Sequence, residues 1–113
     1  MVKLVYCITR RPDMDLATFS RYWRDVHGPL GARIPGLRRL VQSHVIPASR
    51  ALRPPDYDGV AELWFDDMEA LIAARETLEY ELATADEANF IDALRTAFFV
   101  TEEHEVPIAD GDP

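Results

Sequence analysis

Residues 2–30, VKLVYCITRRPDMDLATFSRYWRDVHGPL, contain a strand-like run, a short polar loop and an amphipathic helix. The strand is predicted over residues 2–9, where β-branched and aromatic residues follow one another without Gly or Pro. Asp13 or Asp15 is suited to cap the following helix through its carboxylate. The apolar residues of that helix share one face at a period of 3.6, and they are Leu16, Phe19, Trp23 and Val26.

The helical pattern is interrupted at Gly28-Pro29, directly after His27. Leu30 continues the apolar stripe, so we expect the chain to resume a helical course after this break. The Pro35-Gly36 pair then predicts its end.

The rest of the chain is predicted to form three more strands, over residues 37–46, 59–65 and 96–106. The stretch 47–57 carries three prolines and is predicted to be a loop. Asp66 with Glu69 three places on resembles a capping box and predicts a helix over 67–75. For the acidic segment 76–94 we expect a loop followed by a short helix near 85–93.

The predicted order is strand, helix, strand, and this unit occurs twice in the chain. This order is typical of the α+β class and of the split βαβ, or ferredoxin-like, arrangement. We expect one such domain over residues 1–106, followed by a polar tail at 107–113, since the chain has the length of a single domain.

Both faces of the predicted sheet are apolar. In the first strand, Leu4, Tyr6 and Ile8 alternate with Val5 and Cys7. A sheet with one solvated face alternates apolar with polar residues, and two helices cover only one face. We therefore predict a homodimer in which two sheets pack face to face.

Composition limits the function classes. With 48% hydrophobic residues the chain can build a core, and Cys7, its single cysteine, excludes a disulfide framework and a cysteine-based zinc site. We expect a cytoplasmic protein without a membrane segment, because the N-terminus does not resemble a signal peptide and no apolar run reaches the ~20 residues of a span.

The net charge of −8 is unevenly distributed. Residues 1–55 carry ten Lys or Arg against three Asp, whereas residues 56–113 carry two Arg against seventeen Asp or Glu. The basic residues are spread over several elements, and an acidic chain repels phosphate. We expect no nucleic-acid partner; oppositely charged segments that pack together, within one chain or across a subunit contact, explain the asymmetry.

A set of motifs resembles the EthD-like proteins, which are named after a protein of ethyl tert-butyl ether degradation. The resemblance covers about residues 2–106, and its motifs are Phe19-x-x-Tyr22-Trp23-x-x-x-His27-Gly28-Pro29-Leu30, Gly36-Leu37, Val41-Gln42-Ser43-His44 and Thr101-Glu102-Glu103. The resemblance implies a dimeric α+β barrel. It also implies a small pocket between sheet and helices, worked by a few histidine, tyrosine and acidic side chains.

Three polar residues are candidates for catalysis. His27 has the side chain whose ordinary pKa suits proton transfer near neutrality, and the Gly-Pro pair after it could aim its ring inward. The alternative is that His27 bonds a backbone carbonyl and fixes the bend. Tyr22 could donate to a developing oxyanion or simply pack, and His44 could form a pocket wall or lie at an interface.

Four further residues are assigned to the walls of the pocket, and they are Phe19, Trp23, Gln42 and Glu62. Phe19 and Trp23 are core residues first. In an apolar setting Glu62 could act as a base, or it could lie at the rim and pair with an arginine. For Glu103 and His104 we expect opposite faces of the last strand, with an edge or dimer contact.

These residues favour a small cofactor-independent enzyme that binds a hydrophobic molecule bearing a carbonyl or phenol. Proton abstraction leading to isomerisation, dehydration or cofactor-free oxygenation fits better than hydrolysis, because no nucleophile–base pair is evident. The histidines at 27, 44 and 104 lack metal-ligand spacing, so neither a metal nor a cofactor is expected. Two alternatives stay open: a non-catalytic accessory or binding protein of a degradation pathway, and a purely structural dimeric domain.

Overall fold

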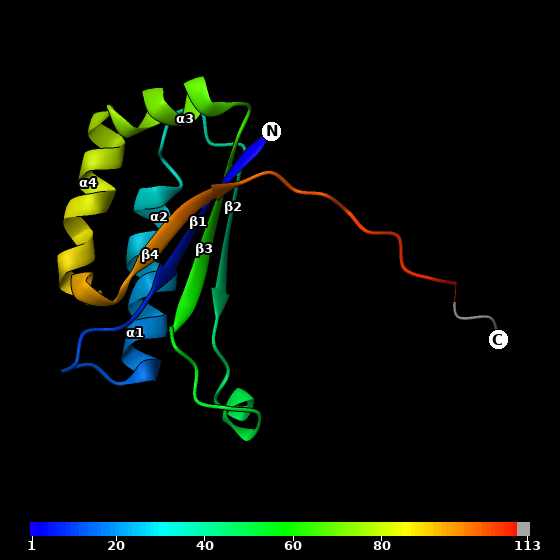
Figure 1. Cartoon of the computed structure of the whole chain (residues 1–113). Coiled ribbons are helices and arrows are strands. Elements are labelled where there is room, and N and C mark those ends of the chain that lie inside the picture. The colour runs from blue at the N-terminus through cyan, green and yellow to red at the C-terminus, as the bar shows by residue number, and fades with distance from the viewer. Residues whose placement is uncertain (111–113) are drawn as a thin grey trace.

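The computed structural model describes residues 1–110 and contains one four-stranded antiparallel sheet (Figure 1). The strands lie in the order β2-β3-β1-β4, and they are β1 (Val2–Ile8), β2 (Arg39–His44), β3 (Gly59–Phe65) and β4 (Ala97–Thr101). In the register, Leu4 lies opposite Leu63 on one side and opposite Val100 on the other. The ferredoxin-like α+β prediction is confirmed.

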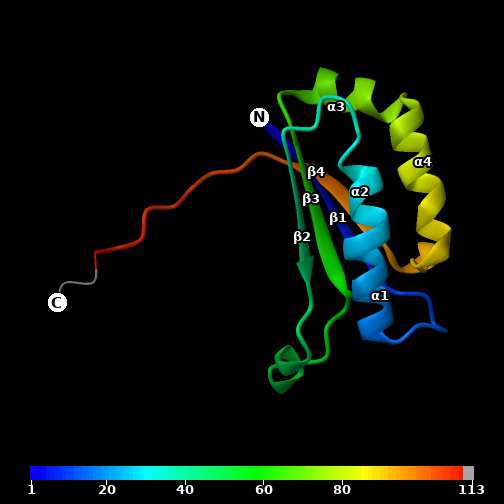
Figure 2. The same cartoon turned by 180° about the vertical axis from the view of Figure 1, so that it is seen from behind.

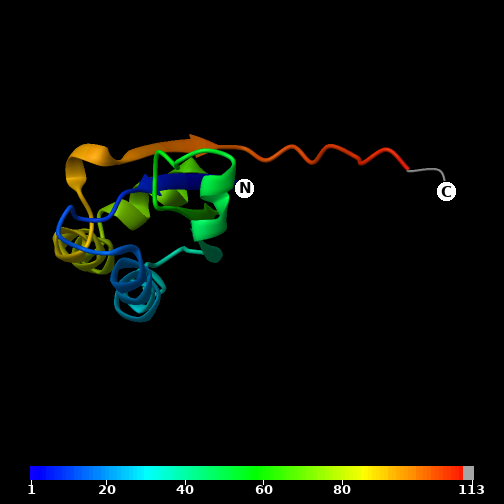
Figure 3. The ribbon, with the colours of Figure 1, turned by 90° about the horizontal axis from the view of Figure 1, so that it is seen from below.

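The helices lie together on one side of the sheet (Figures 2 and 3). They are α1 (Leu16–Tyr22), α2 (Gly28–Gly31), α3 (Met68–Arg75) and α4 (Leu78–Asp86), and a π-helical turn (Trp23–His27) joins α1 to α2. Asp15 caps α1 by accepting from the Thr18 amide at 2.7 Å. Short 3₁₀ turns occur at Pro47–Ala51, Glu87–Asn89 and Ala93–Arg95.

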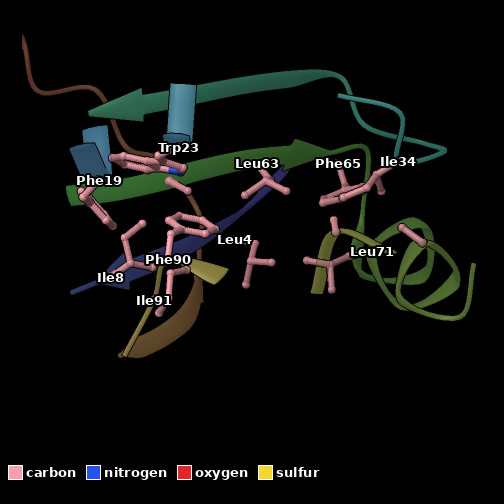
Figure 4. Packing of buried hydrophobic residues seen from close by; sticks show 13 residues of the cluster. Leu4, Ile8, Phe19, Trp23, Ile34, Leu63, Phe65, Leu71, Phe90 and Ile91 are labelled. Carbon is pink, nitrogen blue, oxygen red and sulfur yellow. The ribbon is translucent and has the colours of Figure 1, made fainter. Parts of the chain in front are cut away.

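The core fills the space between the sheet and the helices (Figure 4). Phe19 and Phe65 are fully buried, and so is Phe90, which follows α4. Buried side chains from β1, β3 and the helices α1, α3 and α4 pack together with residues of the connecting segments. The labelled ones are Leu4, Ile8, Phe19, Trp23, Ile34, Leu63, Phe65, Leu71, Phe90 and Ile91. Burial of this apolar surface, at ~25 cal/mol per Å², is the main source of stability.

The predicted interruption of the helix at Gly28-Pro29 is not observed. The chain stays helical because the turn widens, and the Gly28 N–H donates to the Trp23 carbonyl five residues back. A widened turn relieves the clash that a proline ring makes with the carbonyl four residues before it. The extra residue also rotates the helix face, so that Val26, predicted to be inward, is 46% exposed while His27 turns inward.

The short helix expected near 85–93 is also wrong. The helix here is α4, which begins at Leu78 shortly after α3 ends at Arg75, and Thr77 caps it by accepting from the Tyr80 amide. Leu78 and Leu82 are exposed on its outer face, which obscures the helical period in the sequence. Likewise, the N-cap of α3 is Asp67, not Asp66, and Asp67 accepts from the Ala70 amide.

Two strands are shorter than expected. The predicted 37–46 strand is Arg39–His44, and the predicted 96–106 strand is Ala97–Thr101. After Thr101 the chain leaves the sheet and extends away from the domain (Figure 1). Glu103 and His104 therefore do not occupy opposite faces of a strand. Instead, Glu103 accepts a hydrogen bond of 2.6 Å from the Trp64 indole.

The second face of the sheet carries no helix (Figure 3). By the strand alternation, Val5, Glu62 and Phe99 share this face, because Val5 lies opposite both of the others in the register. Phe99 is 50% exposed there. This half-exposed phenylalanine beside Val5 agrees with the apolar character that the sequence predicted for this face.

Candidate functional site

A cavity of about 270 Å³ lies between the helix-covered face of the sheet and the helices. Its walls are mostly apolar side chains from β1, β3 and α4, such as Leu4, Leu63 and Ala83. Several polar side chains interrupt these walls, and they are Tyr6, His27, Gln42, Arg75, Tyr80, Thr84 and Glu87. An apolar cavity with a few polar groups is the usual form of a small-molecule site.

His27 lines this cavity and is held by Asp86. Its Nδ1 lies 2.9 Å from Oδ2 of Asp86, and the two side chains are only 17% and 10% exposed. The widened turn brings the imidazole to the wall, and the last residue of α4 brings the carboxylate to the imidazole. The ring also packs on Phe90, with the centroids 4.7 Å apart.

Asp86 is the centre of a small hydrogen-bond network. Its Oδ1 accepts from the Tyr22 hydroxyl at 2.5 Å and from the Asn89 amide at 3.0 Å. Burial opposes its ionisation, but the hydrogen bonds from Tyr22, Asn89 and His27 outweigh burial and hold the pKa of Asp86 below its ordinary value. Asp86 is therefore a carboxylate at neutral pH.

This carboxylate assigns the protons of His27. An ionised carboxylate only accepts hydrogen bonds, so Nδ1 of His27 carries the proton and Nε2 has the free lone pair. Burial lowers the pKa of His27 below its ordinary value, although the hydrogen bond and the charge of Asp86 act in the opposite direction. The imidazole is thus neutral near pH 7 and can accept a proton at Nε2.

A second polar pair, Tyr6 with Glu87, belongs to the same cavity. The Tyr6 hydroxyl donates to the Glu87 carboxylate, with distances of 3.1 and 3.2 Å to its two oxygens. Burial, together with the charge of Glu87, raises the pKa of Tyr6 to about 12. Burial also raises the pKa of Glu87. Tyr6 therefore keeps its proton at neutral pH and stays a hydrogen-bond donor.

Of the predicted site residues, three line the cavity, and they are His27, Trp23 and Gln42. Gln42 donates to the Trp23 carbonyl at 2.9 Å, so it supports the widened turn from β2. Phe19 lies behind the wall, fully buried between the rings of Trp23 and Phe90.

Tyr22 and His44 lie outside the cavity wall. Tyr22 contacts Asp86 as described above, so it positions the partner of His27. His44 packs on Trp23, with centroids 4.2 Å apart, and its Nε2 lies 2.9 Å from the Gln42 amide oxygen. Burial and the nearby positive charge of Arg24 lower the pKa of His44.

Glu62 does not belong to the cavity wall. It lies on the helix-free face of the sheet, where Oε2 is 2.7 Å from the Lys3 ammonium. The predicted ion pair of Glu62 exists, with a lysine as the partner in place of an arginine. The strand period explains the error, because Ala61 and Leu63 on either side of Glu62 face the cavity.

The sequence-based selection missed Tyr6, Asp86 and Glu87. Asp86 and Glu87 lie in the segment for which a helix near 85–93 was expected. No pattern in that segment indicates that either carboxylate lies near His27. Tyr6 was recognised only as one residue of an apolar strand face. A signal was present in the alternation of β1, which places Tyr6 on the same face as the core residues Leu4 and Ile8.

Within residues 1–110, no group of three His, Cys, Asp or Glu side chains is arranged to hold a metal ion. None of the helices in this same range is long and apolar enough to cross a membrane.

An antiparallel sheet covered on one face by helices, with a cavity between the two layers, defines a small ferredoxin-like α+β protein. The EthD domain model matches residues 11–94, which include the widened turn and the Asp86 carboxylate. The chain belongs to the EthD domain family.

Solved structures agree with this assignment. An ethyl tert-butyl ether degradation (EthD) family protein from Bacillus halodurans is 26% identical, with a TM-score of 0.75, over 92% of this chain and 99% of that one. A dimeric protein of ferredoxin-like fold from Bacteroides fragilis is 14% identical, with a TM-score of 0.67, over 90% and 95% of the two chains.

A third similar structure is that of SnoaB from Streptomyces nogalater, a cofactor-independent oxygenase. It is 15% identical, with a TM-score of 0.65, over 93% of this chain and 94% of that one. At such identities the second and third structures share the fold. No curated protein sequence matches the chain.

Proposed function

We propose that the protein is a cofactor-independent enzyme that binds a hydrophobic carbonyl- or phenol-bearing molecule in the cavity and moves a proton with His27. The observation that carries this proposal is the pairing of His27 with Asp86 at the cavity wall, 2.9 Å apart. A neutral imidazole whose second nitrogen is held by a carboxylate is an oriented general base.

In this reaction Nε2 of His27 removes a proton from a phenol or from the carbon beside a carbonyl. The electron pair left behind moves onto the oxygen, and a phenolate or enolate forms. Asp86 stabilises the imidazolium produced at the same time. The Tyr6 hydroxyl also lines the cavity, but its single proton is donated to Glu87, so Tyr6 can stabilise the oxyanion only by exchanging that hydrogen bond for one to the substrate.

The anion has three outcomes within this class of chemistry. Return of the proton to a different carbon is isomerisation, loss of a neighbouring hydroxyl as water is dehydration, and reaction with molecular oxygen is oxygenation. SnoaB, of similar fold, is described as a cofactor-independent oxygenase, which supports the third outcome as one of the reactions that this fold accommodates.

We also infer that two copies associate through the helix-free face of the sheet. Phe99 is half-exposed on that face beside the buried Val5, and the Lys3–Glu62 ion pair lies on the same face. The similar protein from Bacteroides fragilis is described as dimeric, which supports the formation of a dimer here.

The test is hydrogen–deuterium exchange at a carbon acid. We expect the protein to accelerate deuterium incorporation into 2-tetralone, a bicyclic ketone, as followed by proton NMR in D₂O. His27→Gln is expected to slow this exchange by about 10²-fold or more, the usual contribution of a general base. His104→Gln, which changes an exposed histidine after β4, is the matched control and should leave the rate unchanged.

Two results would contradict the proposal in different ways. Exchange at the wild-type rate in His27→Gln would remove His27 from the role of base. Binding of 2-tetralone without any acceleration by the wild-type protein would favour the alternative, a non-catalytic binding or accessory protein.

A further inference from the structure

We propose that the ligand of this cavity is an anion, a molecule of one or two fused rings whose carboxylate is held by Arg75. This inference rests on the proposed function, since it names the substrate class of the same cavity. It comes from the position of a single guanidinium group, which the sequence did not single out.

Arg75 is the only Lys or Arg among the described residues that line the cavity. It ends α3, and its guanidinium carbon lies 5.7 Å from the ring centroid of Tyr80 and 5.6 Å from that of Phe98. Both rings line the cavity as well. A cation at the C-terminus of a helix is favourable by itself, but that does not account for its position over these two rings.

Arg75 also lacks an acidic partner in the part of the chain that the structure describes. Among residues 1–110, no carboxylate lies within 4.0 Å of its guanidinium, although Glu76 is adjacent in the sequence and Glu79 lies four residues on. Of the other arginines in this range, Arg10, Arg11, Arg24, Arg38 and Arg53 pair with aspartates, whereas Arg21, Arg33, Arg39, Arg50 and Arg95 do not. Arg75 differs from this second group because it lines the cavity. The planar donors of Arg75 are thus available to a ligand.

The chemistry of a guanidinium over aromatic rings selects a carboxylate. Interaction with the rings uses the face of the guanidinium and leaves its N–H groups in the plane, where they match the two oxygens of a carboxylate. The other charged wall residue is Glu87, whose carboxylate already accepts the hydrogen bond from the Tyr6 hydroxyl.

The size of the cavity limits the rest of the molecule. Its volume of about 270 Å³ lies near the lower end of the ~300–1,000 Å³ of ordinary ligand sites. The apolar walls suit an aromatic or aliphatic ring body, and this volume favours one or two fused rings over a larger polycycle.

The test compares two probes of the same shape, 6-hydroxy-2-naphthoate and its neutral carboxamide, by isothermal titration calorimetry at pH 7.5. We expect the wild-type protein to bind the carboxylate on the order of tenfold more tightly, because hydrogen bonds to charged groups exceed neutral ones by about that factor. Arg75→Gln should abolish this preference and leave the affinity for the carboxamide unchanged. Arg75→Lys should retain part of it.

The matched control is Arg95→Gln, which removes an exposed arginine from the same acidic half of the chain and outside the cavity wall. It should keep the wild-type preference. Equal affinities of the wild-type protein for the two probes, or a preference that survives in Arg75→Gln, would overturn this inference and leave the proposed function standing. Binding of neither probe would overturn both, since each requires a ring-binding cavity.

Discussion

Nδ1 of His27 lies 2.9 Å from Oδ2 of Asp86, although the two residues are 59 positions apart in the chain. The contact joins the widened turn after α1 to the C-terminal end of α4. Both side chains are nearly excluded from solvent, so the electrostatics of the pair are set by the protein and only weakly by bulk water.

The titration of His27 tests this contact directly. We expect NMR to find the pKa of His27 below its ordinary value, because burial disfavours the imidazolium. In Asp86→Asn the pKa should fall further, since the carboxylate that favours the charged ring is gone. The pKa of His44, which packs on Trp23, should not change. A rise in the pKa of His27 in Asp86→Asn would contradict the assigned pairing.

Asp86 is also expected to stabilise the fold. Asp86→Asn weakens hydrogen bonds to Tyr22, Asn89 and His27 and should lower the free energy of unfolding by about 1.5–3 kcal/mol. Asp66→Asn is the matched control, because the partner of Asp66 is Arg38 and both side chains are more than half exposed. Asp66→Asn should cost much less stability than Asp86→Asn, because exposed ion pairs contribute little. Guanidinium chloride titrations at pH 7 measure both, and equal costs would argue against the buried network.

The pH dependence of stability should change when Glu87 is replaced. Burial raises the pKa of Glu87 in the folded chain, so stability is lost as the pH rises from the ordinary value of 4.5, where the unfolded chain ionises first. Glu87→Gln does not titrate, and its stability relative to the wild type should therefore increase between pH 4 and pH 8. Glu81→Gln, at an exposed position of α4, should show no such trend. A relative stability of Glu87→Gln that falls with pH would reverse the assigned direction.

Gly59 permits the close approach of Trp23 to the sheet. A Cβ atom at this position would overlap the Trp23 ring and lie 2.9 Å from the Ser43 carbonyl, which belongs to the neighbouring strand. Gly59→Ala should therefore lower the free energy of unfolding by about 1–3 kcal/mol or more. At Gly31 the nearest side-chain atom is 3.6 Å away, so Gly31→Ala should change stability by less than about 1 kcal/mol. Thermal unfolding of the two variants compares them, and a stable Gly59→Ala would contradict the packing described.

Association through the helix-free face predicts that a charge at Phe99 separates the copies. Phe99→Asp should give a monomer in size-exclusion chromatography with light scattering, because a buried unpaired carboxylate is costly at an apolar contact. Leu78→Asp introduces the same charge at an exposed position that begins α4, in the helix layer, and should stay dimeric. A wild-type monomer at micromolar concentration would exclude the dimer altogether.

The local elements near the N-terminus could be predicted because their patterns are short-range. The run at 2–9 forms β1, as its β-branched and aromatic residues without Gly or Pro predict, and Asp15, one of the two predicted caps, caps α1. The acidic segment after α3 could not be assigned correctly, because Leu78 and Leu82 place apolar side chains on the solvent side of α4. Ala83 and Phe90 of this region are buried because they pack against residues of other elements, and the local sequence does not contain those contacts.

By itself, then, the sequence determined the order of strands and helices, the apolar character of both sheet faces, and His27 as the residue to follow, since each of these depends on neighbours within one or two turns of chain. Only the tertiary structure decided which groups surround His27. It replaced Tyr22, His44 and Glu62 at the cavity wall by Tyr6, Glu87 and Arg75, and it supplied Asp86 as the partner of the imidazole. The reason is physical: hydrogen-bond partners and desolvation depend on distances between elements, which the period of a single strand or helix does not contain.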